Sequence, residues 1–279
     1  MIGVFDSGFG GLTVQHALIE ALPQRDFVYL GDNRNTPYGT KPPIDVLTLT
    51  CAGLERLFGE GCTLVIVACN TASVVALRWI QQQWLPARRR EDGVPRNVIG
   101  IVVPTIEAAT GLGWDEEPAA AGEAKPSSTI AVFATPRTVE SGCYPIEIRK
   151  RRPDITVVQQ ACPELASAIE QGVPRDDIRT LVEEYVGELR RKATPDRVIL
   201  GCTHYPLVAE FFAAALPRGV PIIHQPQATA RALRFYLDRH PEYDAGNAGQ
   251  RMFLSTGFSA EALPLIERFW GDKLPFRQA

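Results

Sequence analysis

The stretch LVIVACNTAS at residues 64–73 decides the fold class of this chain. An apolar run rich in β-branched residues leads into Cys69, and small polar residues follow at once. A short, continuous apolar run is typical of a strand that is buried on both faces of a parallel sheet. The stretch therefore predicts a buried parallel strand that ends in a thiol, with a helix or turn directly after it.

The same pattern returns as VILGCTHYP at residues 198–206, where Cys202 lies 133 residues after Cys69. Two further landmarks repeat in the same order. IGVF at residues 2–5 matches IAVF at residues 130–133, a shift of 128 residues, and Phe27–Leu30 matches Ile155–Val158 at that shift. Three landmarks in one order predict that the chain consists of two related halves.

Strand-like runs alternate with helical patterns along the chain, which predicts an α/β fold with parallel sheets covered by helices. We expect two pseudo-symmetric, doubly wound parallel-sheet domains that face each other across the active site. The first domain is expected to comprise residues 1–103 and 219–279, and the second residues 104–218. The predicted strands are Ile2–Phe5, Phe27–Leu30, Leu64–Val67, Val98–Val103, Thr129–Phe133, Ile155–Val158, Val198–Leu200 and Pro221–Ile223. The predicted helices include Thr13–Leu22, Asp45–Phe58, Ala72–Gln83, Arg175–Lys192 and Ala228–Asp238. After the second cysteine strand we expect one more strand and two helical segments.

The composition excludes several classes of function. Of 279 residues, 45% are hydrophobic and 22% are charged, as in ordinary soluble globular proteins. A net charge of -3 gives no electrostatic reason to expect nucleic acid or an anionic membrane as a partner. No apolar run reaches the roughly 20 residues that span a bilayer. Met1 leads directly into IGVF without a basic segment, so we expect no signal peptide and a cytoplasmic protein.

Six cysteines suggest neither a metal site nor disulfide bonds. They form no C-x-x-C pair, and no histidines lie at zinc-binding spacing, so no metal is predicted. A reducing compartment argues against structural disulfides. Four of the cysteines are expected to be small core or near-core residues: Cys51, Cys62, Cys143 and Cys162.

Polar residues gather at the predicted strand ends, where ligands bind in open parallel sheets. The first half has DSGFGG at residues 6–11, GDNRNTPYG at 31–39 and CNTAS at 69–73. The second half has ATPRTVESG at residues 134–142, QQACPE at 159–164 and GCTHYP at 201–206. These segments bring hydroxyls, carboxylates, an amide, a histidine and two thiols to one crevice. The glycine spacing in DSGFGG matches neither a dinucleotide fingerprint nor a P-loop.

Two thiols at equivalent strand ends suggest one kind of chemistry. If one thiolate removes a proton from one face of a carbon and the other thiol donates a proton to the opposite face, the stereocentre is inverted. That reaction needs neither a metal nor an organic cofactor. Asp6 and His204 supply one acid–base group to each half, while Asn70, Thr71 and Thr203 offer hydrogen-bond donors.

The motifs resemble those of the glutamate racemases of the cofactor-independent aspartate/glutamate racemase superfamily. The resemblance covers nearly the whole chain, through FDSGFGGLTV, GDNRNTPYGTK, VACNTAS, ATPRTVESGCY, ACPELASAIEQG and LGCTHYPL. It implies two facing α/β domains with a C-terminal tail that rejoins the first, no cofactor, and glutamate as the substrate. It also implies a homodimer that supplies D-glutamate for bacterial peptidoglycan.

The resemblance also assigns roles to residues. Cys69 would act on D-glutamate with help from Asp6, and Cys202 would act on L-glutamate with help from His204 and Glu170. The implied contacts with the amino and α-carboxylate groups are Ser7, Asn70, Thr71, Thr135, Thr138 and Thr203, and those with the side-chain carboxylate are Pro37-Tyr38-Gly39. Asp6 and His204 are also implied to contact the substrate, with Asp32 as a further acidic position.

The chain departs from the commonest family pattern at three places. Arg34 precedes Asn35, where Ala then Arg is usual, and Val103 replaces an acid found before the proline at position 104. Residues 111–128 form a variable insertion, which we expect to be a solvated loop in the second half.

Three other functions remain open. A related racemase acting on aspartate would use the same two thiols. A cysteine hydrolase would use Cys202 with His204, although we expect side chains two residues apart at a strand end not to reach each other. A carboxylate-binding protein without catalysis would keep the polar contacts but would not need two thiols.

Three histidines lie outside the motifs that carry the resemblance. His16 is expected on a helix surface or an interface, and His240 at an exposed helix end. His224 follows a predicted strand and is the one that could approach the site.

Overall fold

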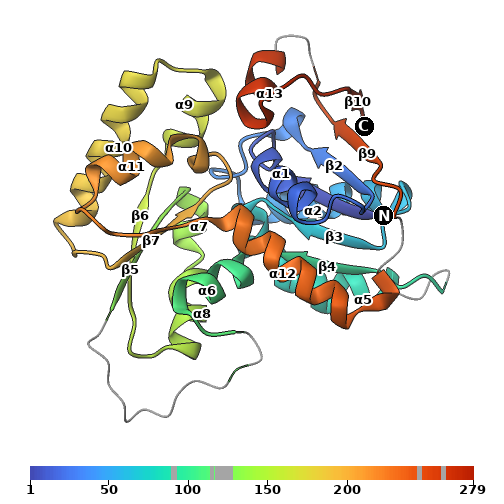
Figure 1. Cartoon of the computed structure of the whole chain (residues 1–279), viewed down its shortest axis with the longest axis horizontal. Helices are drawn as coiled ribbons and strands as arrows, with labels where there is room; N and C mark the ends of the chain where they lie inside the picture. Colours follow the sequence, from blue (N-terminus) through green and yellow to red (C-terminus); the bar gives the residue numbers. More distant parts are fainter. Residues whose placement is uncertain (89–92, 114–115, 117–127, 244–246, 259–261) are drawn as a thin grey trace.

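In the computed structural model, the chain forms two parallel sheets flanked by helices, as the sequence predicts (Figure 1). The structure describes residues 1–88, 93–113, 116, 128–243, 247–258 and 262–279. The predicted α/β class is confirmed. Most of the predicted 111–128 loop, residues 114–115 and 117–127, lies outside the described residues.

The first sheet has six strands in the order β10-β9-β2-β1-β3-β4. All residues of its three central strands are buried, as expected for continuous apolar runs. The last two strands were not predicted, because one begins with an arginine and the other has only three residues. The bounds are β1 Ile2–Asp6, β2 Phe27–Gly31, β3 Leu64–Val67, β4 Asn97–Gly100, β9 Arg251–Ser255 and β10 Phe276–Gln278.

The second sheet, in the order β6-β5-β7-β8, repeats the β2-β1-β3-β4 order of the first. Its bounds are β5 Thr129–Ala134, β6 Thr156–Ala161, β7 Arg197–Gly201 and β8 Ile222–Ile223. In the first sheet Ile2 pairs with Phe27 and Leu64, and in the second Ile130 pairs with Val157 and Arg197. The predicted match of Ile155 to Phe27 is therefore wrong by two residues. Side chains of a strand alternate between its two faces, so a shift of two residues keeps the same faces aligned and a short apolar run does not exclude it.

The two cysteines occupy equivalent positions in this register. Leu64 and Arg197 are the partners of the equivalent residues Ile2 and Ile130. Cys69 and Cys202 each lie five residues beyond these partners. The repeat in the sequence is thus a repeat in the fold, and it places both thiols at matching strand ends.

Two helices cross between the halves. After β4, α6 (Val102–Thr110) packs against α8 (Cys143–Arg151) and β7 of the second half. After β8, α12 (Gln225–Arg239) packs against α1 (Leu12–Ala21) of the first half (Figure 1). Each half therefore ends with a helix that covers the other half.

This crossing changes two predictions. Because β8 pairs with β7, we propose that the chain returns to the first domain after Ile223 rather than at residue 219. The strand predicted over Val98–Val103 ends at Gly100, and α6 begins at Val102. Pro104 falls in the first turn of that helix, where a missing N–H costs nothing.

The other helices follow the predicted pattern with one break. The helix predicted over Ala72–Gln83 is divided into α3, α4 and the π-helical turn η2. The remaining bounds are α2 Pro43–Gly59, α3 Asn70–Val75, α4 Leu77–Trp79, η2 Ile80–Trp84, α5 Leu85–Arg88, α7 Pro136–Glu140, α9 Leu165–Gln171, α10 Arg175–Arg190, α11 Ala209–Ala215 and α13 Leu263–Trp270, with 3-10 turns η1 Asn33–Asn35, η3 Tyr205–Val208 and η4 Pro241–Tyr243. No helix in the described ranges is long and apolar enough to cross a membrane.

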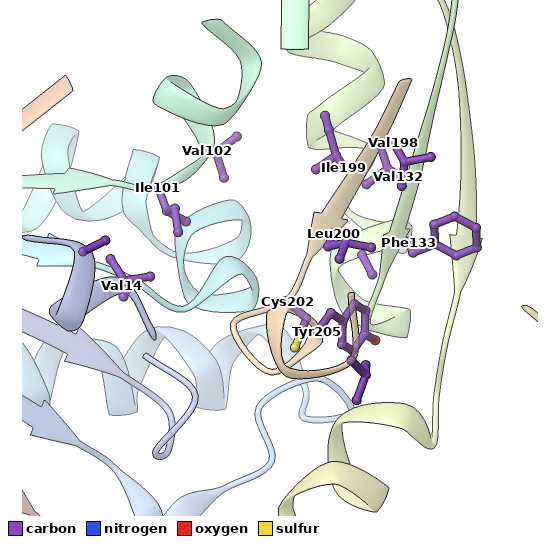
Figure 2. Close-up of a cluster of buried hydrophobic side chains, with 14 of the residues drawn as sticks. Val14, Ile101, Val102, Val132, Phe133, Val198, Ile199, Leu200, Cys202 and Tyr205 are labelled. Carbon is purple, nitrogen blue, oxygen red and sulfur yellow. The ribbon is translucent and has the colours of Figure 1, made fainter. Parts of the chain in front are cut away.

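One hydrophobic core runs through both halves. Figure 2 shows Val132, Phe133 and Ile199 of the second sheet within it, and Cys202 just beyond the end of β7. Cys62 and Cys162 are buried and Cys51 and Cys143 partly buried, which confirms their prediction as core or near-core residues. All six cysteines have free thiols.

Candidate active site

A cavity between the two halves contains both strand-end thiols. It lies at the carboxyl ends of the central strands, where the sequence predicts a ligand. Most of the expected site residues line it: Ser7, Pro37, Tyr38, Gly39, Cys69, Asn70, Thr71, Thr135, Glu170, Cys202, Thr203 and His204. The expected residues Asp6, Asp32 and Thr138 lie behind this lining, and each contacts a residue of it.

Cys69 is held at the beginning of α3. It is the N-cap of that helix, and its Sγ accepts a hydrogen bond from the Ala72 backbone N at 3.5 Å. The same sulfur lies 3.4 Å from the Ser7 hydroxyl. Burial raises the pKa of the Cys69 thiol to about 12, the Asp6 carboxyl adds to this, and the Ser7 and Ala72 contacts oppose it. Cys69 is therefore protonated at neutral pH.

Asp6 is the last residue of β1; its charge raises the pKa of Cys69, and its Oδ1 accepts a hydrogen bond from the Thr203 hydroxyl at 3.4 Å. Its Oδ2 accepts hydrogen bonds from the backbone N of Gly8 at 3.1 Å and of Gly11 at 3.0 Å. A Cβ at Gly11 would lie 2.4 Å from the Asp6 Cβ, so the helix can approach this closely only through glycine. Burial raises the pKa of the Asp6 carboxyl to about 6, against the opposing effects of His204 and the two backbone donors.

Cys202 has a different partner. Its Sγ lies 3.7 Å from Nδ1 of His204, and the other ring nitrogen, Nε2, lies 3.5 Å from Glu170 Oε2. The second contact is an ion pair whose geometry does not make a hydrogen bond. The prediction that residues two apart would not reach each other is wrong here, because a turn rather than a helix follows β7 and folds the imidazole back toward the sulfur.

The imidazole and the carboxylate stabilise each other's charge. Burial lowers the pKa of His204, but its contacts with Cys202 and Glu170 outweigh burial and raise the pKa well above its ordinary value. Burial likewise raises the pKa of Glu170, but the contact with His204 and a 3.3 Å hydrogen bond from Thr36 lower it overall. Phe269 packs edge-on against the imidazole at 5.3 Å between ring centroids.

Three threonine hydroxyls join the halves beside the cavity. Oγ1 of Thr71, from the first half, lies 3.0 Å from that of Thr135 and 3.3 Å from that of Thr138. Thr135 is also the N-cap of α7, where its Oγ1 accepts from the Thr138 backbone N at 3.4 Å. Thr138 thus holds the two lining hydroxyls in place from behind.

The segment that carries Pro37, Tyr38 and Gly39 closes one end of the cavity. The Tyr38 hydroxyl donates to Asp32 Oδ2 at 2.6 Å, and the Thr256 hydroxyl donates to Asp32 Oδ1 at 2.6 Å. Asp32 therefore supports this segment from behind the cavity wall.

The same segment touches the second half. A Cβ on Gly39 would lie 2.7 Å from the Thr135 Cβ, so the two halves meet closely here. Arg137 donates from its backbone N to the Gly39 carbonyl at 3.1 Å and from Nε to the Lys41 carbonyl at 2.9 Å.

Sequence reasoning missed part of the lining. The missed residues are Thr36, Thr40, Pro136, Pro163, Ala166 and Ser167. A signal was available for the last three, because positions 163, 166, 167 and 170 have the spacing of one helix face. Glu170 alone was identified, although it shares that face.

The other histidines lie away from the thiols. His16 and His224 line a separate cavity of about 420 Å³ between α1, α13 and the start of α12. His240 stacks on Tyr236 and lies 3.0 Å from Glu242. The larger cavity contains neither thiol nor carboxylate, so we place the candidate site in the smaller one. Across the described residues, no cluster of three or more His, Cys, Asp or Glu could hold a metal ion.

Known proteins resemble this chain along its whole length. A family described as Asp/Glu/Hydantoin racemase matches residues 12–233. The glutamate racemase of Phenylobacterium zucineum is 54% identical over 100% of this chain and 99% of its own. The solved glutamate racemase of Bacillus anthracis has a TM-score of 0.82 at 28% identity, covering 100% of this chain and 97% of that one. That of Francisella tularensis, solved in complex with D-glutamate, has the same TM-score and identity and covers 100% and 95%.

Proposed function

The chain belongs to the Asp/Glu/hydantoin racemase family, and on this premise we propose that it is an isomerase that interconverts L- and D-glutamate through two cysteines. One observation carries the proposal. Cys69 and Cys202 occupy equivalent positions in two related halves and line the same cavity. Paired thiols with separate acid–base partners suit proton removal and proton donation at one carbon.

Each thiol serves one face of the α-carbon. With L-glutamate, the Cys202 sulfur takes the α-proton, and the Cys69 S–H donates its proton to the opposite face of the carbanion. With D-glutamate the two roles are exchanged. One proton is removed and one is added in each direction, so the reaction requires no oxidant, metal or cofactor.

The surroundings of Cys69 favour its protonated form. Burial keeps the proton on Cys69, since its pKa is raised to about 12. On the other side His204 Nδ1 lies 3.7 Å from the Cys202 sulfur, and the contacts of the imidazole with Cys202 and Glu170 raise the pKa of His204. In the direction from L-glutamate, the protonated Cys69 is therefore the proton donor. After turnover the Ser7 hydroxyl and the Ala72 N–H can donate to a Cys69 thiolate.

The polar lining would hold the two carboxylates of the substrate. Ser7, the threonine hydroxyls and the Asn70 amide would bind the amino and α-carboxylate groups, and the Pro37-Tyr38-Gly39 segment the side-chain carboxylate. Aspartate is one methylene shorter, so it cannot reach that segment while its α-carbon stays between the sulfurs. The preference for glutamate should therefore exceed the roughly 1–3 kcal/mol of a methylene, because misplacement also disturbs catalytic geometry.

The proposal extends to the cellular role. Relatives named glutamate racemases occur in bacteria such as Phenylobacterium zucineum, and we place this chain in the cytoplasm as a homodimer that supplies D-glutamate for peptidoglycan. Size-exclusion chromatography with light scattering tests the dimer. A monomer at assay concentrations would contradict it.

Circular dichroism on L-glutamate tests the reaction. Protein dialysed exhaustively against a chelator should bring the signal to zero as the racemate forms, and L-aspartate should turn over far more slowly. Activity that appears only after pyridoxal phosphate or a metal is added would contradict the two-thiol reaction. Comparable turnover of L-aspartate would contradict the assigned substrate.

The contact between Cys202 and His204 supports a second candidate, a thiol hydrolase. That function leaves Cys69 unused. A Cys69→Ser variant would then retain full activity toward a thiol-hydrolase substrate, whereas a racemase would lose its activity.

A further inference from the structure

A buried hydrogen-bond network connects the cavity to the helices that cross between the halves. Asn70 lines the cavity, while Gln225 lies behind it at the first position of α12 with 2% of its surface exposed. Thr105 of α6 and Tyr144 of α8 complete the network and are fully buried. Buried polar networks of this kind hold one geometry when each member finds its partners.

The two amides form a reciprocal pair. Asn70 Nδ2 donates to Gln225 Oε1 at 2.9 Å, and Gln225 Nε2 donates back to Asn70 Oδ1 at 3.1 Å. The Tyr144 hydroxyl donates to the same Asn70 Oδ1 at 2.7 Å. Gln225 Nε2 also lies 2.9 Å from the Tyr144 hydroxyl and 3.0 Å from the Thr105 hydroxyl.

Thr105 decides which way both amides point. Its hydroxyl donates to the Ile101 carbonyl at 2.7 Å, so toward Gln225 it can only accept. The nitrogen of Gln225 must therefore face Thr105, and its oxygen must face Asn70. That orientation in turn requires Asn70 to present its nitrogen to Gln225 and its oxygen to Tyr144.

The remaining capacity of Asn70 follows from this arrangement. Its oxygen accepts from two donors, and one of its two N–H groups is used by Gln225. An amide has two N–H donors, so a single N–H is left. Because Asn70 lines the cavity, this donor is suited to a carboxylate oxygen of the substrate.

We propose that Gln225 and Tyr144 are positioning residues that hold the Asn70 amide as a hydrogen-bond donor to the substrate carboxylate. Neither of them lines the cysteine cavity. This inference rests on the proposed function, since it assumes that the substrate is a carboxylate bound between the thiols. Because α6 and α12 are the helices that cross between the halves, the network also ties the Asn70 donor to their packing.

A double-mutant cycle tests the proposal. Gln225→Met removes the amide at similar size, and Tyr144→Phe removes only the hydroxyl. We expect KM for glutamate to rise about tenfold in Gln225→Met and about threefold in Tyr144→Phe, with kcat changed less than about twofold, as for a lost ground-state contact. In an Asn70→Ala background, Gln225→Met should raise KM no further, because a residue that acts through Asn70 has nothing left to position.

Thr229→Val is the matched control. Thr229 is buried one turn further along α12, and its hydroxyl donates to the Gln225 backbone carbonyl at 2.9 Å rather than to a side chain of the network. Its replacement should lower thermal stability about as much as Gln225→Met without raising KM. An equal rise of KM in Thr229→Val would mean that the effect is general loosening, and would overturn the proposal.

Other outcomes separate this inference from the proposed function. Independent, multiplying effects of Asn70→Ala and Gln225→Met would refute the positioning role while leaving the racemase intact. A wild type that does not racemise glutamate would refute the proposed function itself. If Gln225→Met does not fold, Tyr144→Phe with and without Asn70→Ala gives the same decision.

Discussion

The surroundings of Cys69 and Cys202 differ, although the two residues occupy the same position in the repeated fold. Cys69 caps a helix, and Asp6, whose charge raises the pKa of that thiol, has its own pKa raised to about 6 by burial. Cys202 leads into a turn and contacts His204, which is paired with Glu170. The two halves therefore share the backbone arrangement around the cysteine, but different acid–base residues lie near each thiol. In the proposed reaction one thiol must hold a proton while the other does not, and the burial of Cys69 favours the proton on that thiol.

The residues directly after each cysteine explain the difference. After Cys69, Asn70 begins α3 at once, and the N–H of Ala72 points back at the sulfur. After Cys202, a turn and a short 3-10 helix come first, and α11 begins only at Ala209. The sulfur of Cys202 therefore lacks the helix N-terminus that Cys69 has, and the His204 imidazole, whose pKa is raised by its contacts, lies beside it instead.

The largest expected effect comes from removing either thiol. Cys69→Ser and Cys202→Ser should each reduce racemisation by at least about 10⁴-fold, because a hydroxyl is a far poorer base than a thiolate at neutral pH. Elimination from a substrate analogue with a good β-leaving group needs only one base. Cys69→Ser should retain elimination from the L-analogue, and Cys202→Ser from the D-analogue.

Two results would break the comparison between the two sides. The opposite pattern of elimination would exchange the faces assigned to the cysteines. Full racemisation by either variant would eliminate the two-base reaction. As a control, Cys162→Ser replaces a buried thiol outside the cavity and should leave the elimination pattern unchanged.

The acid–base partners should have the next largest effect. Asp6→Asn and His204→Asn should each lower kcat/KM on the order of 10³-fold, within the range of general acid–base catalysis. L- and D-glutamate have equal free energies, so kcat/KM must fall equally in both directions. The elimination reaction distinguishes which thiol each residue assists. Asp6→Asn should slow elimination from the D-analogue, and His204→Asn should slow elimination from the L-analogue. Equal impairment of both analogues in one variant would mean that its residue serves both thiols.

The smallest effect concerns stability, and it has a defined sign. Burial raises the pKa of Asp6 from 3.8 to about 6. Between these pH values the unfolded chain ionises while the folded chain keeps the proton, so this group makes the fold less stable as pH rises through the window. Above pH 6 the full loss is reached, and a pKa shift of about two units lowers the free energy of unfolding by about 3 kcal/mol.

Asp6→Asn should remove this loss. The free energy of unfolding of the variant minus that of the wild type should be about 3 kcal/mol larger at pH 8 than at pH 4. Urea unfolding of both proteins at the two pH values measures the difference. A difference of the opposite sign would mean that the folded state favours the ionised carboxylate, and that the pKa of Asp6 is lowered rather than raised by folding.

The sequence alone determined the fold class and the equivalence of the two thiols. Both depend on local information, because continuous apolar runs specify buried strands and the residue spacing within each half sets the register. The sequence also predicts that the polar segments lie at one edge of each sheet, since parallel strands all end on the same side. Most of the cavity lining therefore came from motifs such as CNTAS and GCTHYP.

Only the tertiary structure decided the rest. The edge strands β9 and β10, the crossing of α6 and α12, and the contact of Thr256 with Asp32 all depend on residues far apart in the chain. The same holds for the contact of His204 with Glu170 and for the raised pKa of Asp6. A strand run shows which residues will be buried, but the pKa of a buried carboxyl depends on which groups pack around it. Those groups come from both halves of the molecule, and local sequence patterns do not specify how the halves meet.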